Sequence, residues 1–264
     1  MLTLSFGFPA LEAEFWRWVF LMTRIGAALF AAPFFGAANV AMEVRVILTA
    51  ALAALVAGWT GAVAPEHLMS GAGFMAILGE ILIGLSLGFV LQFGFAAPAI
   101  AAEVIGGGMG MGLAATVDPQ NGERSPVLAQ YFNVVLTLVF LSLGGHLQWL
   151  ALVVKSYSVF PPGAVLGPNG FGPEHIHAIL NLTSAMFATA VAIALPVSLV
   201  LLLVQMLSGV LSRSAPALNL FSLGLPAGII AGVAALLAST PLITDDMVRI
   251  SAEMIGDVSR VLGG

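Results

Sequence analysis

The sequence has 264 residues, of which 60% are hydrophobic and 8% are charged, and its formal net charge is -5. Soluble domains carry about 25% charged residues, so this composition excludes an ordinary water-soluble globule, a disordered chain and a nucleic-acid-binding protein with a basic face. The sequence contains no cysteine, which excludes disulfides, catalytic thiolates and cysteine-ligated zinc. A polytopic helical membrane protein remains, or an apolar subunit of a membrane-associated assembly.

Six apolar segments are long enough to be read as membrane-embedded helices, and the expected fold is all-α, built of long helical hairpins. Strands are not expected, because an open sheet leaves backbone groups without partners in lipid. Pro196 predicts a kink in the fifth segment. The segments are approximately 15–35, 46–64, 74–102, 127–154, 176–211 and 217–240.

The tail from Asp245 to Gly264 is polar but periodic, and it predicts a short amphipathic helix outside the hydrocarbon. Its charged residues lie mostly away from a single apolar stripe. That stripe consists of Met247, Ile250, Met254, Val258 and Val261.

Helix length and charge distribution both argue against six plain transmembrane spans. Segment 74–102 would be about 43 Å long as a helix, against about 30 Å of hydrocarbon. Such helices either protrude from the bilayer or lie against other protein subunits. Basic residues are also almost evenly divided between the two sides, where the positive-inside rule predicts a bias. With the N-terminus inside, one side holds Arg17, Lys155, Arg249 and Arg260, and the other holds Arg45, Arg124 and Arg213.

Several polar residues fall within the apolar segments, and Arg24 and Glu80 are the most deeply embedded. A charge at mid-bilayer costs about 2.5–3.5 kcal/mol on insertion scales. The two alternatives are an intramolecular pair or snorkelling side chains, and a proton or ion relay. A relay would need several acidic groups on one helix face, but the next one along is Glu103, so a pump is not expected. The further candidates for intramembrane polar contacts are Gln92, Gln130 and Asn133.

Gly84 and Gly88 form a GxxxG pair in the third segment. Small residues at this spacing let a neighbouring helix approach closely. The pair therefore predicts helix packing and nothing more specific.

The most unusual stretch is rich in glycine and methionine, and five glycines in seven positions are not expected inside a stable helix. Either it is a flexible connector, or it is a mobile apolar loop that closes a passage, since methionine can pack against irregular surfaces. Its formal match to the dinucleotide fingerprint is discounted because no strand precedes it. We call residues 106–113 the glycine–methionine segment: Gly106, Gly107, Gly108, Met109, Gly110, Met111, Gly112 and Leu113.

Catalysis and metal binding find no support in the sequence. His175 and His177 form an HxH pair beside Glu174, but no third ligand follows at a suitable spacing. No segment resembles a nucleophile elbow. We therefore expect no enzymatic activity, no metal and no cofactor.

Three stretches together resemble the FliR family of flagellar export-gate proteins of the bacterial type III secretion apparatus. The first is Arg24–Gly36. The second runs from Gly79–Leu85 through Gln92 and the glycine–methionine segment to Asp118–Gln120. The third is Ala215–Pro226. The resemblance covers nearly the whole chain.

This resemblance implies a single-copy subunit that joins FliP-like and FliQ-like membrane proteins in a helical export channel at the flagellar basal body, in the bacterial inner membrane. It implies a FliP-like region over residues 1–170 and a FliQ-like helical hairpin over 171–264. The glycine-rich loop, about 106–122, would be the plug of the closed pore. Further partners would be other membrane components of the export apparatus, membrane lipid and exported unfolded protein substrates, with no nucleic acid.

Two alternatives stay open at this point. One is the corresponding gate subunit of a virulence-type secretion system. The other is a self-sufficient small-molecule transporter, which would usually show an inverted repeat. The two halves of this sequence differ in segment length and motifs, which disfavours a transporter.

Overall fold

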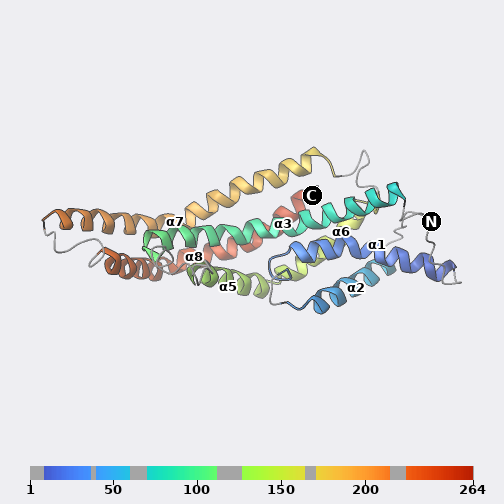
Figure 1. Cartoon of the computed structure of the whole chain (residues 1–264), viewed down its shortest axis with the longest axis horizontal. Helices are drawn as coiled ribbons and strands as arrows, with labels where there is room; N and C mark the ends of the chain where they lie inside the picture. The colour runs from blue at the N-terminus through green and yellow to red at the C-terminus, as the bar shows by residue number, and fades with distance from the viewer. Residues whose placement is uncertain are drawn as a thin grey trace. The chain divides into compact units, whose positions relative to one another are not determined.

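The computed structural model describes residues 9–36, 40–59, 70–111, 127–163, 171–214 and 224–263. Within these ranges the regular structure is entirely α-helical (Figure 1), which confirms the predicted all-α fold. The helices are α1 (Pro9–Ala31), α2 (Met42–Trp59), α3 (Gly71–Gly108), α5 (Val127–Ser142), α6 (Gly145–Val159), α7 (Pro173–Ser214) and α8 (Leu225–Val261).

The predicted helix boundaries are wrong in two places, the apolar run 127–154 and the start of the polar tail. The apolar run 127–154 is not one helix, because α5 ends at Ser142 and α6 begins at Gly145. Gly144 lies between them with φ of 70°, a left-handed conformation that glycine adopts without strain. Hydropathy does not register this break, because the residues around it are as apolar as those of the helices.

The polar tail is not a separate helix either. α8 runs without interruption from Leu225 to Val261, with Pro241 inside it. Asp245 and Asp246 change the polarity of the helix but do not break it. The predicted apolar stripe of the tail is confirmed, since all five of its residues are buried: Met247, Ile250, Met254, Val258 and Val261.

Three of the helices are much longer than a bilayer is thick. α3 has 38 residues, α7 has 42 and α8 has 37. At 1.5 Å per residue these helices extend about 55–63 Å, roughly twice the hydrocarbon thickness of about 30 Å. By length and composition, α2, α3, α7 and α8 could each cross a membrane, and α5 with α6 could together make a fifth span. α1 is not among them, and it carries Glu12, Glu14, Arg17 and Arg24.

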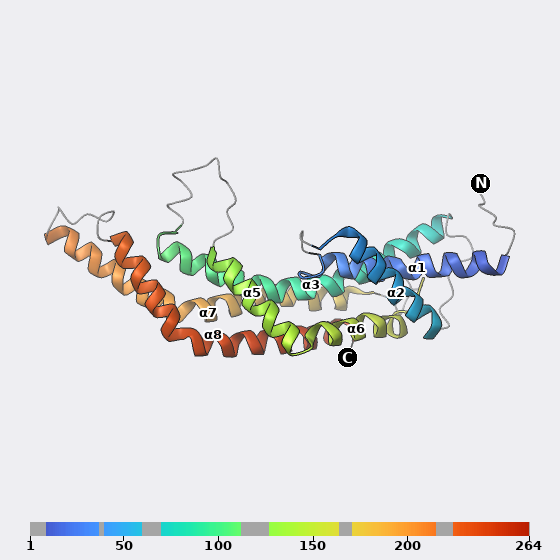
Figure 2. The same ribbon diagram turned by 90° about the horizontal axis from the view of Figure 1, so that it is seen from below.

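The chain divides into two compact units, and both are discontinuous in sequence. Unit 1 comprises Met1–Phe93, Gly144–Leu182 and Met254–Gly264, and unit 2 comprises Gly94–Leu143 and Thr183–Glu253. Within unit 2, the C-terminal half of α7 and the N-terminal half of α8 run side by side in both views (Figures 1 and 2). The expected division into a FliP-like region over residues 1–170 and a FliQ-like region over 171–264 concerns family likeness, and it stays a prediction.

In unit 1, α1 packs against the N-terminal half of α3 at very short range. A Cβ added at Gly84 would overlap the carbonyl oxygen of Arg24, and one added at Gly88 would lie 2.5 Å from the Cβ of Ala31. The close approach predicted from the GxxxG spacing is therefore confirmed. α6 adds Trp149, which is fully buried and donates a hydrogen bond of 3.1 Å to the carbonyl of Leu87.

We expect Gly84→Ala to destabilise the protein, because the added methyl group meets backbone atoms of α1 that cannot move without separating the helices. Overpacking of this kind costs about 1–3 kcal/mol. Gly58→Ala is the matched control, since a Cβ at Gly58 meets no atom within 4 Å. Thermal unfolding of the two variants in detergent measures the difference. Equal stability of both variants would contradict the close packing of α1 on α3.

Candidate functional site

A fully buried ion pair joins α1 to α3 in unit 1. The Nε of Arg24 donates to Oε2 of Glu80 at 2.7 Å, and its Nη2 donates to Oε1 of Glu80 at 3.0 Å. Neither side chain is accessible to solvent. This two-point geometry matches the planar guanidinium to the planar carboxylate and gives the strongest form of charge-assisted hydrogen bond.

The remaining donors of Arg24 are directed to the end of α6. Nη1 donates to Oγ of Ser156 at 3.1 Å, and Nη2 also donates to the carbonyl of Phe160 at 2.9 Å. The guanidinium carbon lies 4.1 Å from the ring centroid of Tyr157, which is within cation–π range. The backbone N–H of Gly163 donates to the Glu80 carboxylate at 3.1 Å, so both ions are solvated by the protein itself.

Of the two alternatives for Arg24 and Glu80, the structure shows the intramolecular pair. A relay needs an access path for protons or ions, whereas here both groups are closed off from solvent and hydrogen-bonded to each other and to neighbouring groups. Sequence reasoning did not identify Ser156, Tyr157 and Phe160 as partners. They lie more than 130 residues beyond Arg24, and no local spacing signals such a contact.

The other three polar candidates behave differently from one another. Gln92 donates at 3.1 Å to the carbonyl of Ala31, the last residue of α1, and so satisfies one of the carbonyls that a helix end leaves open. Gln130 is exposed. Asn133 has a buried Oδ1 that finds no hydrogen-bond donor among the described residues. These residues do not form one site with Arg24 and Glu80.

The glycine–methionine segment begins inside α3 rather than after it. Gly106, Gly107 and Gly108 form the last turn of this helix, contrary to the expectation of a loop from residue 106 onward. Glycine costs about 1 kcal/mol in a helix interior, but a helix end tolerates it. Gly110 then adopts φ of 80°, the left-handed conformation that commonly ends a helix. Gly112 and Leu113 lie outside the described residues, as does the remainder of the expected plug up to residue 122.

The two methionines of the segment differ in their exposure to solvent. The side chain of Met109 is 4% exposed, whereas that of Met111 is 38% exposed. Met109 lies on α8, where a Cβ added at Gly232 would be 2.5 Å from its Cγ and 2.8 Å from its Sδ. This glycine surface of α8 was not predicted from the sequence as the contact of Met109. The spacing of Gly228 and Gly232 on the last apolar segment is the signal that could have indicated it.

A second helix also contacts the beginning of the segment. Nε2 of Gln205 on α7 donates at 2.9 Å to the carbonyl of Gly108, the last residue of α3. Leu201 of α7 fills the space beside Gly108, where a Cβ would lie 3.0 Å from its Cδ1. The described start of the segment is thus held between α7 and α8 in unit 2.

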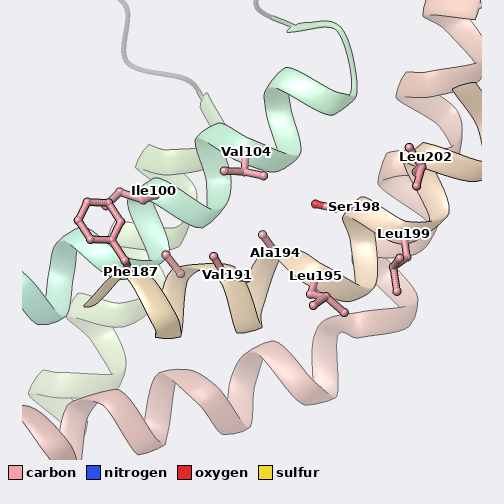
Figure 3. A pocket seen from close by; sticks show the side chains of 10 residues that line it. Ile100, Val104, Phe187, Val191, Ala194, Leu195, Ser198, Leu199 and Leu202 are labelled. Carbon is pink, nitrogen blue, oxygen red and sulfur yellow. The ribbon is translucent and has the colours of Figure 1, made fainter. Parts of the chain in front are cut away.

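An apolar groove of about 360 Å³ lies between α3 and α7 in unit 2 (Figure 3). Ser198 is the only polar residue in its lining, and its buried Oγ has no hydrogen-bond partner among the described residues. A lining without charge offers no acid, base or nucleophile pair for catalysis. The lining residues are Ile100, Val104, Phe187, Ala190, Val191, Ala194, Leu195, Ser198, Leu199 and Leu202.

The described histidines form no metal site, and no group of three potential ligands occurs in the described ranges of the chain. His175 stacks on Phe171, and its Nδ1 accepts a hydrogen bond of 3.1 Å from the N–H of Gly172. It therefore packs the start of α7. His67, the earliest histidine, lies outside the described ranges.

Comparison with known proteins gives a consistent set of relatives. Residues 15–254 match the family described as bacterial export proteins, family 1. The chain is 31% identical to the flagellar biosynthetic protein FliR of Pectobacterium carotovorum subsp. carotovorum over 251 residues, 94% of this chain and 92% of the relative. It is 34% identical to FliR of Escherichia coli (strain K12) over 186 residues, 69% of each chain. It is also 36% identical to the surface presentation of antigens protein SpaR of Shigella flexneri over 146 residues, 55% of each chain.

Removal of one partner of the buried pair should be more damaging than removal of both. We expect Arg24→Leu alone to cost about 3–5 kcal/mol, because it leaves the Glu80 carboxylate buried without a counter-ion. The double variant Arg24→Leu with Glu80→Leu should recover some of that loss. Thermal unfolding in detergent measures both. Arg249→Leu is the control. Arg249 pairs with Asp246 in a partly exposed ion pair, so this variant should change the stability by about 1 kcal/mol or less. A double variant less stable than either single variant would contradict this account of the pair.

Proposed function

The chain belongs to the bacterial export proteins, family 1, and we propose that it is a structural and gating subunit of the flagellar type III protein export channel. The observation that carries this proposal is the family match over residues 15–254, together with relatives named as flagellar biosynthetic proteins. In this role the chain is needed to translocate flagellar subunits across the inner membrane and so to assemble the flagellum.

The exposed surface of α7 supports a place inside a larger assembly. Large apolar side chains are exposed at consecutive positions of this helix, for example Leu202, Leu203, Met206 and Leu207. At about 100° per residue these four positions span an arc of about 140° on the helix, so α7 presents a broad apolar face that requires protein or lipid against it. Because α7 is about twice as long as the hydrocarbon is thick, lipid alone cannot cover it. We infer that FliP-like and FliQ-like subunits cover the rest.

The chemistry of the glycine–methionine segment supports a gating role. A gate in a protein channel must exclude water and ions, yet yield to a passing chain. Glycines give the backbone freedom to rearrange, and methionine packs adaptably against different neighbours. Met111 already has an exposed apolar side chain in the described conformation. We infer that the segment is the plug of the closed channel.

A second candidate function is the corresponding subunit of a virulence-type export system. The match to SpaR supports it, but that match covers 55% of the chain, whereas the Pectobacterium FliR match covers 94%. A stand-alone transporter is disfavoured by the family match. Among the described side chains, the buried ion pair is closed off from solvent and the groove between α3 and α7 is uncharged, so neither supports an enzyme.

Loss of this chain should abolish flagellar export. We expect a strain that lacks the gene to be non-motile and to retain flagellar subunits inside the cell, with both defects reversed by a plasmid copy. The tagged chain should purify from membranes as a defined complex with FliP-like and FliQ-like proteins. A motile deletion strain with lost secretion of other proteins would instead favour the virulence-type function. A monodisperse monomer that transports small molecules in liposomes would favour a transporter.

Shortening of the segment should make the closed channel leak. We expect deletion within residues 106–112 to raise the permeability of the membrane to small ions when the companion subunits are present. Gly110→Glu should impair export instead, because the left-handed backbone and the added charge prevent the segment from packing or withdrawing. Conductance and motility assays measure the two effects. If the deletion neither leaks nor alters export, the segment is only a connector.

A further inference from the structure

We propose that Met109 is a clasp: its side chain, seated on α8 at Gly232, holds the described part of the glycine–methionine segment, Gly106–Met111, in place and must leave that seat before this part can move. This inference rests on the proposed gating function and adds to it the contact that sets the resting position. It concerns residues of unit 2 alone.

The seat exists because Gly232 has no side chain. Three atoms of Met109 lie where a Cβ at position 232 would be in severe contact: Cγ at 2.5 Å, Sδ at 2.8 Å and Cε at 2.9 Å. Gly228, one helical turn earlier, lies beneath the backbone of the same methionine, with its Cβ position 3.5 Å from the carbonyl oxygen of Met109. Burial of Met109 is nearly complete at 4% exposure. The fit of one side chain against the surface at these two glycines therefore fixes the position of the chain just after the end of α3.

The residues on either side of Met109 are held independently. Before it, the Gly108 carbonyl accepts a hydrogen bond from Gln205 of α7 at 2.9 Å. After it, Gly110 has φ of 80° and lies so close to α8 that a Cβ would be 2.5 Å from Cδ2 of Leu225. These contacts hold the chain on both sides of Met109 where it leaves α3. Met111 is then the first residue of the segment with a substantially exposed side chain.

The clasp is made of contacts that can be broken and remade. The flexible, unbranched side chain of Met109 makes only apolar contacts with the glycine surface, so no ion pair has to break when it moves. The hydrogen bond from Gln205 is exposed, so water can replace it. Such contacts should stabilise the closed state over the open state by only a modest difference in free energy. Both conformations of the gate can then be populated.

A cysteine pair tests whether Met109 must leave its seat. The natural chain has no cysteine, so Met109→Cys with Gly232→Cys gives a unique pair, and the close approach of the two positions suits a disulfide. In cells that express the full export apparatus, we expect oxidation to form the cross-link and stop export of flagellar subunits, and reductant to restore it. The control pair is Met109→Cys with Gly209→Cys, because Gly209 has no atom within 4 Å of its Cβ position.

A cross-link that forms while export continues as fast as in the reduced protein would overturn the clasp, as would failure of the pair to cross-link in the resting state. Failure of the proposed function gives a different result. In that case a strain without the chain exports normally, whatever the cysteine pair does. A strain that needs the chain, but exports through the cross-linked form, rejects the clasp alone.

A second variant serves if the reduced cysteine pair is itself inactive. Gly232→Ala places a methyl group where Met109 sits, and we expect it to raise resting ion leakage roughly tenfold, the shift that one overpacked contact produces. Gly256→Ala makes the same substitution on the same helix, but its Cβ meets no atom within 4 Å, so leakage should stay at the wild-type level. Equal leakage in Gly232→Ala, Gly256→Ala and wild type would overturn the clasp.

Discussion

The buried pair of Arg24 and Glu80 is the interaction on which the described packing of unit 1 depends. Two opposite charges are held without solvent, which is favourable only when each remaining hydrogen-bonding group also finds a partner. The protein supplies most of these partners by bringing Ser156 and the Phe160 carbonyl to the guanidinium, and the Gly163 amide to the carboxylate. The absence of a side chain at Gly84 belongs to the same arrangement, because a Cβ there would overlap the Arg24 backbone. Close helix approach and ion pairing thus occur at the same part of the junction between α1 and α3.

Glycine pairs create close contacts in both units, but their partners differ in kind. In unit 1, Gly84 and Gly88 meet backbone and Cβ atoms of α1, which have no freedom to move separately from the helix. In unit 2, Gly232 meets the flexible side chain of Met109. The first contact is suited to a permanent helix junction, and the second to a junction that opens. This contrast fits the proposed gating role, in which the subunit keeps its shape in a channel while one segment moves.

Much of the fold could be predicted from the sequence, because hydropathy reports directly on which residues avoid water. It indicated the helical class, the excessive helix lengths and the buried stripe from Met247 to Val261. Hydropathy missed the break at Gly144 and predicted a division of α8 that the structure does not have. Both features depend on backbone conformation rather than on polarity. It also began the glycine–methionine segment too early, since three glycines continue α3 when the following residues anchor its end.

For the site, the amino-acid sequence alone identifies the residues that are chemically unusual: two charges in apolar segments, and a run of glycine and methionine between apolar segments. It determined the family too, because motifs persist in order along the chain. The contacts of these residues, in contrast, are visible only in the folded chain. Arg24 and Glu80 are 56 residues apart, and Gln205 and Gly108 are 97 apart. Contacts over such separations arise from how helices pack, and helix packing depends on the shape of whole surfaces rather than on any local spacing of residues.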